Sequence, residues 1–488
     1  MTINKNRTKK YSALLAIGLL SGNAFSQSLS NMTVVGPFKS TNTSAGANAS
    51  AGIWGWTATN GQEYALLTSR TTGGTSIVSI GSAAAPTAPR ELNFLPAGVN
   101  SIWHELMGYG NYVYKISQQG SVGLQIINMT PVQTGGNATI LKTMALYNGN
   151  LTGHTVFVDS TTTPKRLYVT YGSAAGVAIY SLLDPTTPVL IGVIAGESHD
   201  MYGLGNRLFI STQRRGTVEI WDVTTPAIPM PTTARLGIIN LTTRSRANGE
   251  IGAAATTIAH NAWPTADGKY LFTTEEIAGT YMKAWDVTNP ATASTNGYLG
   301  RWVGVPGIIP HNGFINGRYL YVGHYTAGMY QVDILNIAAM RTVGWHTPRA
   351  INAGDLYGGT WGVYGWFPSR RFIHGDDTYG LYVLTPAAAN ADPTGVPTFP
   401  VSLAEDISLN ALTITSMHRD EIRFQLPHSG GYSLSIFSPG GARLFNVRKQ
   451  GISGMQSLSI GNNLAGGSYV ARLEQNTEVL NRMVSLPK

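Results

Sequence analysis

A short phrase of alternating apolar and polar residues recurs along the chain. Each copy begins at or just after a Gly, continues with alternating apolar side chains and often ends in Asp or Pro. A period of two is typical of a β-strand that buries one face. Seven copies can be recognised, with leading glycines at Gly74, Gly123, Gly176, Gly216, Gly279, Gly328 and Gly380. The pattern predicts a repeat protein built from strands.

Each repeat holds more than one strand. An aromatic-rich strand, such as Tyr319–Val322, precedes the Gly phrase, and a shorter one, such as Arg341–Gly344, follows it. Another strand is expected before these, after a His or Trp. The leading glycines lie 40 to 63 residues apart, which fits four-stranded units. Seven units of this length predict a closed seven-bladed β-propeller, an all-β fold.

The last repeat, which ends at Pro386, lacks a convincing fourth strand. The segment Asn31–Gly36 resembles the missing strand, although it lies at the other end of the sequence. An open ring would leave unpaired strand edges, and closure removes them. We therefore predict that the propeller spans residues 31–386 and is closed by its own N-terminal strand.

A second unit follows the propeller. Residues Ala387–Pro400 are rich in Ala and Pro and are interpreted as a linker. Residues 401–488 contain short strand-like runs, two of them bounded by Gly-Gly turns, and are predicted to form a small β-sandwich. The predicted runs are 412–416, 421–425, 432–437, 457–460 and 468–473.

The N-terminus has the features of an export signal. Four basic residues precede an apolar run from Ala13 to Leu20, and Ala24-Phe25-Ser26 fits the small-x-small cleavage rule. The apolar run is too short to span a bilayer. Residues 1–26 are therefore interpreted as a signal peptide, which makes the mature protein secreted or exposed at the outer cell surface.

Composition narrows the range of functions. The chain has 57 Gly and 24 Pro but only 12% charged residues, as expected for an all-β protein with many turns. The absence of Cys excludes disulfides, thiolate metal sites and a lipid-anchored N-terminus. Cleavage of the signal lowers the net charge from +8 to +4, because the segment holds four basic and no acidic residues. This small charge does not indicate nucleic-acid binding.

Several phrases resemble the LVIVD-repeat propellers, in particular the secreted "choice-of-anchor B" group. The residues that carry the resemblance are His260–Pro264, Asp267–Glu276, His311–Phe314, Tyr319–Gly328 and Trp361–Ser369, with Gly380–Leu384. The resemblance covers residues 31–386. It implies the propeller fold and says little about function, because that family is defined by its repeats and its varied C-terminal anchors.

The C-terminal unit resembles the sorting domains of type IX secretion cargo. Tyr432–Phe437, Leu464–Val470 and the basic-ended tail Arg482–Lys488 carry the resemblance. The chain departs from that pattern at Gly441-Ala442-Arg443, where the family has a basic residue directly after Gly. The resemblance implies that this unit contacts the secretion machinery.

Histidines occupy equivalent places in five repeats. His104, His154, His199, His260 and His311 each lie just before or within the predicted first strand, where Trp361 stands in the last repeat and Trp54 or Trp56 in the first. Equivalent positions on the innermost strands surround one axis. We therefore predict a His-rich channel mouth, with His104, His154, His199 and Trp361 as ligand-binding residues.

A second set of polar residues follows the predicted second strands. Glu275, His324 and Asp376 lie at corresponding places there, and the end of the second strand lies at the same face as the start of the first. Nitrogen and oxygen donors of this kind suit zinc or another divalent first-row ion. The residues predicted to bind this metal are His260, His311, His324, Glu275 and Asp376.

Structural interpretations of the same residues remain open. A repeated His can bond a carbonyl of the neighbouring blade, and the strand aromatics can serve packing alone. Trp361, Tyr364 and Trp366 can instead form a platform for a sugar. The acidic residues that end the Gly phrases, such as Asp222 and Asp286, are interpreted as turn formers.

Three functions are compatible with the sequence. The first is an exported propeller that binds an extracellular ligand, such as a glycan, at the His-rich mouth. The second is a metal-dependent or His/Tyr-dependent extracellular enzyme, such as a polysaccharide lyase or hydrolase. The third is a structural or adhesive protein of the envelope. Gly-x-Ser-x-Gly, the phosphate loop, His-Glu-x-x-His and the EF-hand loop are absent from the sequence.

Overall fold

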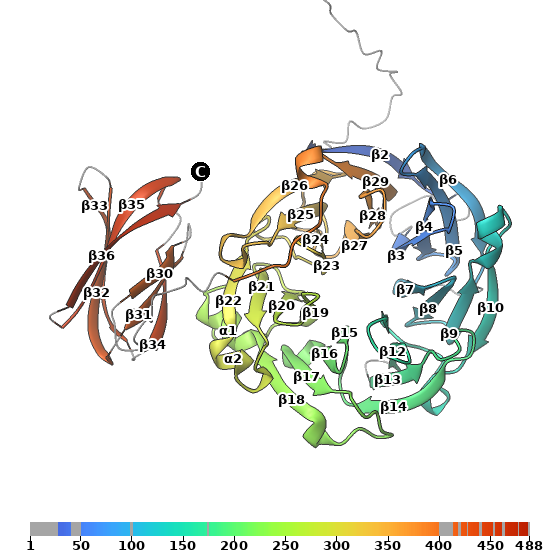
Figure 1. Cartoon of the computed structure of the whole chain (residues 1–488), viewed down its shortest axis with the longest axis horizontal. Helices are drawn as coiled ribbons and strands as arrows, with labels where there is room; N and C mark the ends of the chain where they lie inside the picture. Colours follow the sequence, from blue (N-terminus) through green and yellow to red (C-terminus); the bar gives the residue numbers. More distant parts are fainter. Residues whose placement is uncertain are drawn as a thin grey trace, which may run out of the picture.

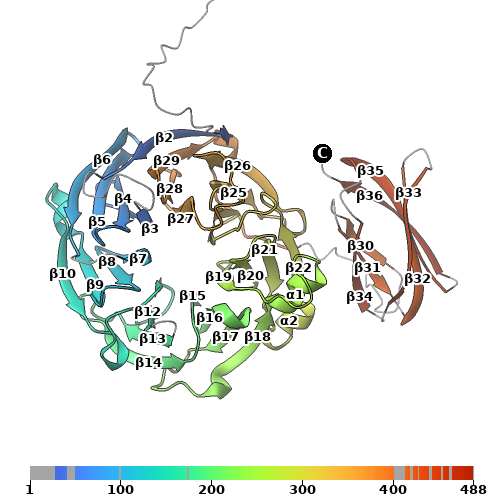
Figure 2. The same cartoon turned by 180° about the vertical axis from the view of Figure 1, so that it is seen from behind.

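A ring of seven β-sheets dominates the computed structural model (Figures 1 and 2). The structure describes residues 28–40, 50–97, 101–172, 175–399, 413–417, 421–426, 428–438, 442–451, 454–460, 464–476 and 478–486. The proposed signal peptide, residues 1–26, lies outside these ranges. The chain is a seven-bladed β-propeller followed by a small β-sandwich, as the sequence predicts.

The blades follow one another along the chain, and each begins at its innermost strand. Blades 1 to 3 contain β3 (Ser50–Thr57), β4 (Gln62–Ser69), β5 (Thr75–Ser82) and β6 (Pro86–Leu95); β7 (His104–Tyr109), β8 (Tyr112–Ser117), β9 (Leu124–Asn128) and β10 (Thr139–Met144); and β11 (Val156–Asp159), β12 (Arg166–Tyr171), β13 (Gly176–Ser181) and β14 (Val189–Ala195). Blades 4 and 5 contain β15 (Met201–Leu204), β16 (Arg207–Thr212), β17 (Thr217–Asp222) and β18 (Arg235–Asn240); and β19 (Ala259–Pro264), β20 (Tyr270–Glu275), β21 (Met282–Asp286) and β22 (Tyr298–Trp302). Two short helices, α1 (Leu241–Ala247) and α2 (Ala293–Asn296), belong to connections near blades 4 and 5.

The N-terminal segment completes the ring. Blade 6 contains β23 (Asn312–Asn316), β24 (Tyr319–Gly323), β25 (Met329–Asp333) and β26 (Arg341–Thr347), with β1 (Ser28–Ser30) added at its edge; blade 7 contains β27 (Thr360–Tyr364), β28 (Phe372–Asp376), β29 (Gly380–Pro386) and β2 (Met32–Phe38). In blade 7, β2 pairs antiparallel with β29, with Met32 opposite Pro386 and Val34 opposite Leu384. The predicted closing strand is confirmed.

Neighbouring blades share apolar cores. Tyr114 and Ile126 of blade 2 pack in one cluster with Leu167 and Val169 of blade 3, and comparable clusters join the other blades. The alternating phrases bury both faces of the central strands of each sheet because each blade is covered on both sides. The predicted turn formers are also confirmed: Asp222 Oδ1 accepts from Thr224 N, and Asp286 Oδ1 accepts from Thr288 N.

Packing of the closing strand can be tested by mutation. Met32 is buried between blades 6 and 7, whereas Val35 on the same strand is 46% exposed. We expect Met32→Ala to lower the free energy of unfolding by about 2–3 kcal/mol, because it leaves a cavity in the core. Val35→Ala, the matched control, should change it by less than about 0.5 kcal/mol. Urea unfolding measures both, and equal effects would contradict this packing of β2.

Residues 387–400 are the predicted linker, and the described part of it, residues 387–399, runs along blade 6. Arg318 N donates to Pro393 O (2.9 Å), Ile337 N donates to Thr398 O (2.9 Å) and Gln331 Nε2 donates to Asn390 O (2.8 Å). Among the described residues, no helix is both long and apolar enough to cross a lipid bilayer.

The C-terminal unit consists of two packed sheets. One contains β30 (Thr413–Met417), β31 (Glu421–Leu426) and β34 (Gly454–Ser459), and the other contains β33 (Arg443–Gly451), β32 (Gly430–Phe437), β35 (Gly467–Gln475) and β36 (Glu478–Leu486). Phe424 of the first sheet and Leu434 and Leu473 of the second share one buried core. The sequence patterns did not predict β33 and β36.

Candidate functional site

Four imidazoles stand in a row around the propeller axis. The ring centroids of His154 and His199 are 4.2 Å apart, those of His199 and His260 are 4.3 Å apart, and those of His260 and His311 are 4.2 Å apart. The indole of Trp361 continues the row at 4.5 Å from His311. These residues come from blades 3 to 7, so the structure brings together five of the seven equivalent positions that the repeats suggest.

Hydrogen bonds to neighbouring blades hold the row. His311 Nδ1 lies 2.8 Å from Trp361 O, and His199 Nδ1 lies 3.3 Å from His260 O. A carbonyl only accepts, so each Nδ1 carries the proton and each Nε2 keeps a lone pair. The structural interpretation is confirmed for these two histidines. The same contact is what orients an imidazole whose Nε2 binds a metal.

Burial keeps these imidazoles neutral. It lowers the pKa of His199 to about 4 and that of His311 to about 3, and it holds the pKa of His154 and of His260 well below the usual range. Neutral imidazoles with available Nε2 atoms are the form in which histidine binds metals.

Glu276 brings a carboxylate to the row. Its Oε2 lies 3.9 Å from His260 Nε2, and its Oε1 lies 4.0 Å from His311 Nε2. Tyr325 OH donates to Glu276 Oε1 at 2.5 Å. Burial raises the pKa of Glu276 to about 7, and the hydrogen bond from Tyr325 opposes that shift. Ligand atoms of His199, His260 and Glu276 all lie within 4.8 Å of one another.

A cavity of about 460 Å³ opens beside the row. We call it the histidine mouth, and its walls include Arg70, Trp103, His154, His199, His260, Glu276, Tyr325, Tyr357 and Trp361. On the other side of the row, a small cavity of about 40 Å³ lies among Glu105, Asp200 and Asn312. Trp361 Nε1 donates to Glu105 Oε1 at 3.1 Å, and Asn261 Nδ2 donates to Asp200 Oδ2 at 2.7 Å.

Aromatic side chains pack at the opposite end of the channel. Trp263 contacts Trp366 (centroids 5.6 Å apart) and Tyr202 (4.2 Å), and Trp54 contacts Trp366 (5.7 Å) and Tyr364 (5.0 Å). Trp361 belongs to the histidine row instead. The three residues suggested as one sugar platform are therefore divided between the two ends of the channel.

His104 does not join the row. It is buried at the start of β7 and belongs to the walls of neither cavity. Successive residues of a strand point to opposite faces, and in this blade it is the next residue, Glu105, that faces the channel. Blade 2 is thus offset by one residue from the pattern of blades 3 to 6.

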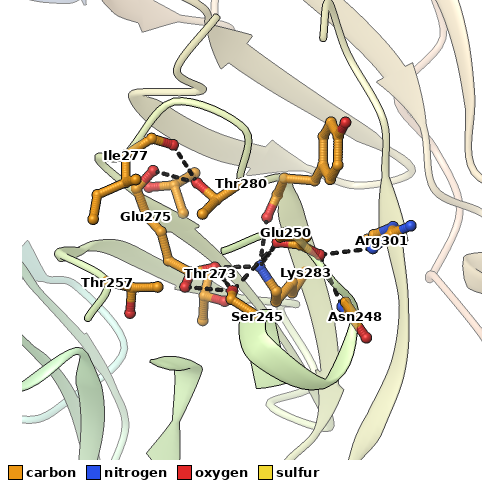
Figure 3. A network of polar contacts seen from close by, with 12 residues as sticks. Ser245, Asn248, Glu250, Thr257, Thr273, Glu275, Ile277, Thr280, Lys283 and Arg301 are labelled. Carbon is orange, nitrogen blue, oxygen red and sulfur yellow. Dashed lines mark hydrogen bonds and ion pairs between the residues drawn. The ribbon is translucent and has the colours of Figure 1, made fainter. Parts of the chain in front are cut away.

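Glu275 faces away from the histidine row, into the network shown in Figure 3. Its carboxylate forms an ion pair with Lys283 and accepts from Ser245 Oγ at 2.7 Å. Lys283 also pairs with Glu250 at 2.7 Å, and Arg301 pairs with Glu250 at 2.8 Å. This network ties the segment after β18 to blade 5.

His324 and Asp376 lie outside the mouth as well. His324 Nε2 accepts from Val305 N at 3.0 Å, and its ring packs beside Trp302. Asp376 forms an ion pair with Arg349 at 3.0 Å and accepts from Tyr379 N at 2.8 Å. Of the five residues predicted to bind one metal, only His260 and His311 are close together.

The solved structures that resemble this chain are β-propellers at low sequence identity. No protein-family model matches the sequence, and no curated protein matches it either. A virginiamycin B lyase from Staphylococcus aureus in complex with quinupristin is 12% identical, with a TM-score of 0.47, over 74% of this chain and 99% of the other. A periplasmic gluconolactonase from Pseudomonas aeruginosa is 12% identical, with a TM-score of 0.44, over 60% and 85%. At these identities the likeness concerns the fold alone.

Glu276 and Tyr325 are among the residues of the mouth that were not predicted from the sequence. Alternation of side chains along a strand gives a signal for Glu276, because residues two apart lie on the same face. Thr274 on β20 is two residues before Glu276, and its Oγ1 donates to His311 O at 2.7 Å. Tyr325 lies in the turn after β24 with a φ of 36°, an uncommon value for a residue other than Gly. Nothing in the repeat pattern marks that turn as part of the mouth.

Proposed function

We propose that this chain is an exported β-propeller that binds an extracellular ligand at the histidine mouth through a divalent first-row metal ion. The observation that carries the proposal is the convergence of His199, His260 and Glu276, with ligand atoms within 4.8 Å of one another. Two imidazoles and one carboxylate form a donor set used in zinc sites that keep a position open for a further ligand.

One pair of ligand atoms, from His260 and Glu276, is close to the spacing of a zinc site, and all three ligand atoms lie within 4.8 Å of one another. Zn–N and Zn–O bonds of about 2.0–2.2 Å place the ligand atoms of a tetrahedral site roughly 3.3–3.6 Å apart. The contact of 3.9 Å between His260 Nε2 and Glu276 Oε2 is a few tenths of an ångström longer. The hydrogen bond from His199 Nδ1 to His260 O leaves His199 Nε2 available as a ligand atom. His311 Nε2 lies 4.0 Å from Glu276 Oε1 and offers a further nitrogen beside the site.

We extend the proposal to the location of the protein. The basic and apolar segments of residues 1–26 support export, and the resemblances to LVIVD-repeat propellers and to type IX sorting domains support a place outside the cell. Antibody labelling of intact cells, with and without residues 401–488, tests this assignment. Retention of the full chain inside the cell would contradict it.

Catalysis at the same mouth is the second candidate function. The observation that favours it is the Tyr325–Glu276 pair, a proton donor and an acceptor in contact beside the metal ligands. Tyr325 holds a left-handed backbone conformation, and Gly359 packs so closely that an added Cβ would lie 2.3 Å from the carbonyl of Tyr325. Strained residues recur at active sites. Turnover of a bound polysaccharide by the wild type, lost in Tyr325→Phe, distinguishes an enzyme from a binding protein.

Zinc binding tests the main proposal. The full mature chain, treated with a chelator and titrated with Zn²⁺ in a calorimeter, should bind one equivalent. Loss of a residue that only hydrogen-bonds a metal ligand typically weakens metal binding roughly 10- to 100-fold. His260→Ala and Glu276→Gln each remove a proposed ligand, so each should weaken zinc binding at least this much. Saturation at about 100 times Kd should stabilise the fold by about 2.7 kcal/mol.

The control is His428→Ala, which removes an exposed histidine from the C-terminal unit. Zinc affinity should be unchanged in this variant. If wild type and His260→Ala bind zinc equally, the metal site does not exist as proposed.

A further inference from the structure

Arg70 is the cationic residue in the wall of the histidine mouth. It follows β4, and only 9% of its side chain is exposed. Its guanidinium carbon lies 5.3 Å from the centre of the Trp361 ring, which stands next to His311 in the row. The charge of Arg70 is close enough to lower the pKa of His311, although burial has the larger effect. Arg70 therefore faces the same space as the proposed metal ligands.

The guanidinium is not fully paired. Arg70 Nη1 lies 3.6 Å from Asp377 Oδ2, an ion pair without a hydrogen bond. Nε and Nη1 are buried and donate to no atom of the residues that the structure describes. Asp377 is already engaged: Arg349 pairs with its Oδ1, which also accepts from Gly359 N at 2.9 Å. Unpaired buried donors are rare in folded proteins and require an explanation.

We propose that the ligand of the histidine mouth carries a carboxylate group and that Arg70 binds it. This inference rests on the proposed function, because it assigns the chemistry of the ligand at that same mouth. A guanidinium presents paired N–H donors that match the two oxygens of a carboxylate. With a divalent ion bound to His199, His260 and Glu276, the positive charges of the mouth are those of the ion and of Arg70, and the negative charge of its wall is that of Glu276. This net positive charge favours an anionic ligand.

Aromatic walls define the rest of the ligand. Trp103 and Trp361 line the mouth, and Tyr357 at its rim is 51% exposed. Flat apolar surfaces beside a few polar groups are typical of sites that bind ring-shaped molecules. Together these features favour a ring that bears a carboxylate, as in an acidic sugar.

The experiment compares acid and neutral probes of the same shape. Galacturonate and galactose, and in parallel benzoate and benzyl alcohol, are titrated into the zinc-loaded mature chain and followed by tryptophan fluorescence. Each acid should bind roughly 10- to 100-fold more tightly than its neutral partner, the usual range for hydrogen bonds to charged groups. Arg70→Gln should abolish this preference, and zinc should still bind, because the substitution removes no proposed metal ligand.

Two variants serve as controls. Arg70→Lys keeps the charge but loses the paired donors, so it should retain only part of the preference. Lys269→Gln removes a 60%-exposed charge from the turn between β19 and β20 and should change nothing. Equal binding of acid and neutral probes by the wild type, or an undiminished preference in Arg70→Gln, overturns the inference. Absence of zinc binding overturns the metal proposal separately, because the acid preference is also measured on the chelated protein.

Discussion

Lys283→Met should lower the free energy of unfolding by about 3–5 kcal/mol, because it leaves the buried carboxylate of Glu275 without its cation and that of Glu250 with Arg301 as its remaining cation. The Lys283 side chain is 0% exposed, and those of its partners Glu275 and Glu250 are 0% and 1% exposed. Burial raises the pKa of Glu275 and the charge of Lys283 lowers it, so removal of Lys283 leaves the effect of burial opposed by the hydrogen bond from Ser245. Met preserves the length and most of the volume of the Lys side chain. Urea unfolding at neutral pH measures the change.

The matched control is Lys269→Met. Lys269 is 60% exposed and pairs with Asp267 at 3.8 Å, and the loss of such a surface pair should cost less than about 1 kcal/mol. Combining Lys283→Met with Glu275→Gln should recover part of the stability, because the double change removes the charge of the carboxylate that has lost its cation. A loss below that of the control variant would mean that the network in Figure 3 does not stabilise blade 5.

Glu275 belongs to this network, and a substitution there tests whether Glu275 or Glu276 is the metal ligand. The sequence pattern selected Glu275, whereas the structure directs Glu276 to the histidine row. Glu275→Gln should therefore leave zinc affinity within about twofold of the wild type, since the site is independent. Loss of zinc binding in this variant would restore the assignment made from the sequence.

Repetition made the fold predictable. Seven copies of one strand pattern determine the number of blades, and the unpaired end of the last copy indicates that Asn31–Gly36 closes the ring. β2 pairs with β29 in that manner. The sandwich was less well predicted because β33, with six exposed residues of its nine, lacks the apolar alternation that marks the other strands.

The prediction of the site was limited by uncertainty of one residue in which side chains of a strand face the channel. Aligning repeats by their His positions assumes one register in every blade, but a shift of one residue turns a side chain to the opposite face. That shift separates His104 from Glu105 in blade 2 and Glu275 from Glu276 in blade 5. Register shifts also occur within the pairing of β19 with β20 and of β27 with β28.

Other residues of the mouth could not be predicted from the repeats for a different reason. Arg70 and Tyr325 lie in connections that follow the second strands of blades 1 and 6, and their neighbours in space come from other blades. Sequence periodicity carries no information about such contacts. Their importance follows from burial, unpaired donors and backbone strain, all of which are properties of the folded structure.

Buried histidines outside the mouth should make the fold sensitive to acid. His104, His324, His346 and His374 are at most 1% exposed. Burial lowers the pKa of His104 to about 3 and those of His324 and His346 to about 4, and it holds the pKa of His374 well below its usual value. Their contacts need the neutral form: His324 Nε2 accepts from Val305 N, and His346 Nδ1 lies 2.8 Å from His374 Nε2.

The direction of the pH dependence follows from these shifts. Above about pH 6.5 the histidines are neutral in both states and contribute no pH dependence. Below it the unfolded chain binds protons that the folded protein excludes, so the free energy of unfolding falls as the pH falls, until the folded pKa values of about 3 to 4 are reached. Each histidine contributes about 1.4 kcal/mol per pH unit, so the four outside the mouth alone contribute about 5 kcal/mol per pH unit, and the four buried histidines of the row add to this slope. Because native stability is typically about 5–15 kcal/mol, unfolding is expected within roughly one to three units below pH 6.5.

Urea unfolding in steps from about pH 7 to pH 4, with a chelator present, measures this slope. His324→Gln should reduce the slope by about 1.4 kcal/mol per pH unit, whatever it does to stability at neutral pH, because it removes one group that titrates differently in the two states. His428→Gln, which changes an exposed histidine, should leave the slope unaltered. A free energy of unfolding that stays constant down to about pH 5 would mean that these histidines bind protons equally in the folded and unfolded states. Their burial between the blades would then impose no cost on the charged form, contrary to the packing observed around His324 and His374.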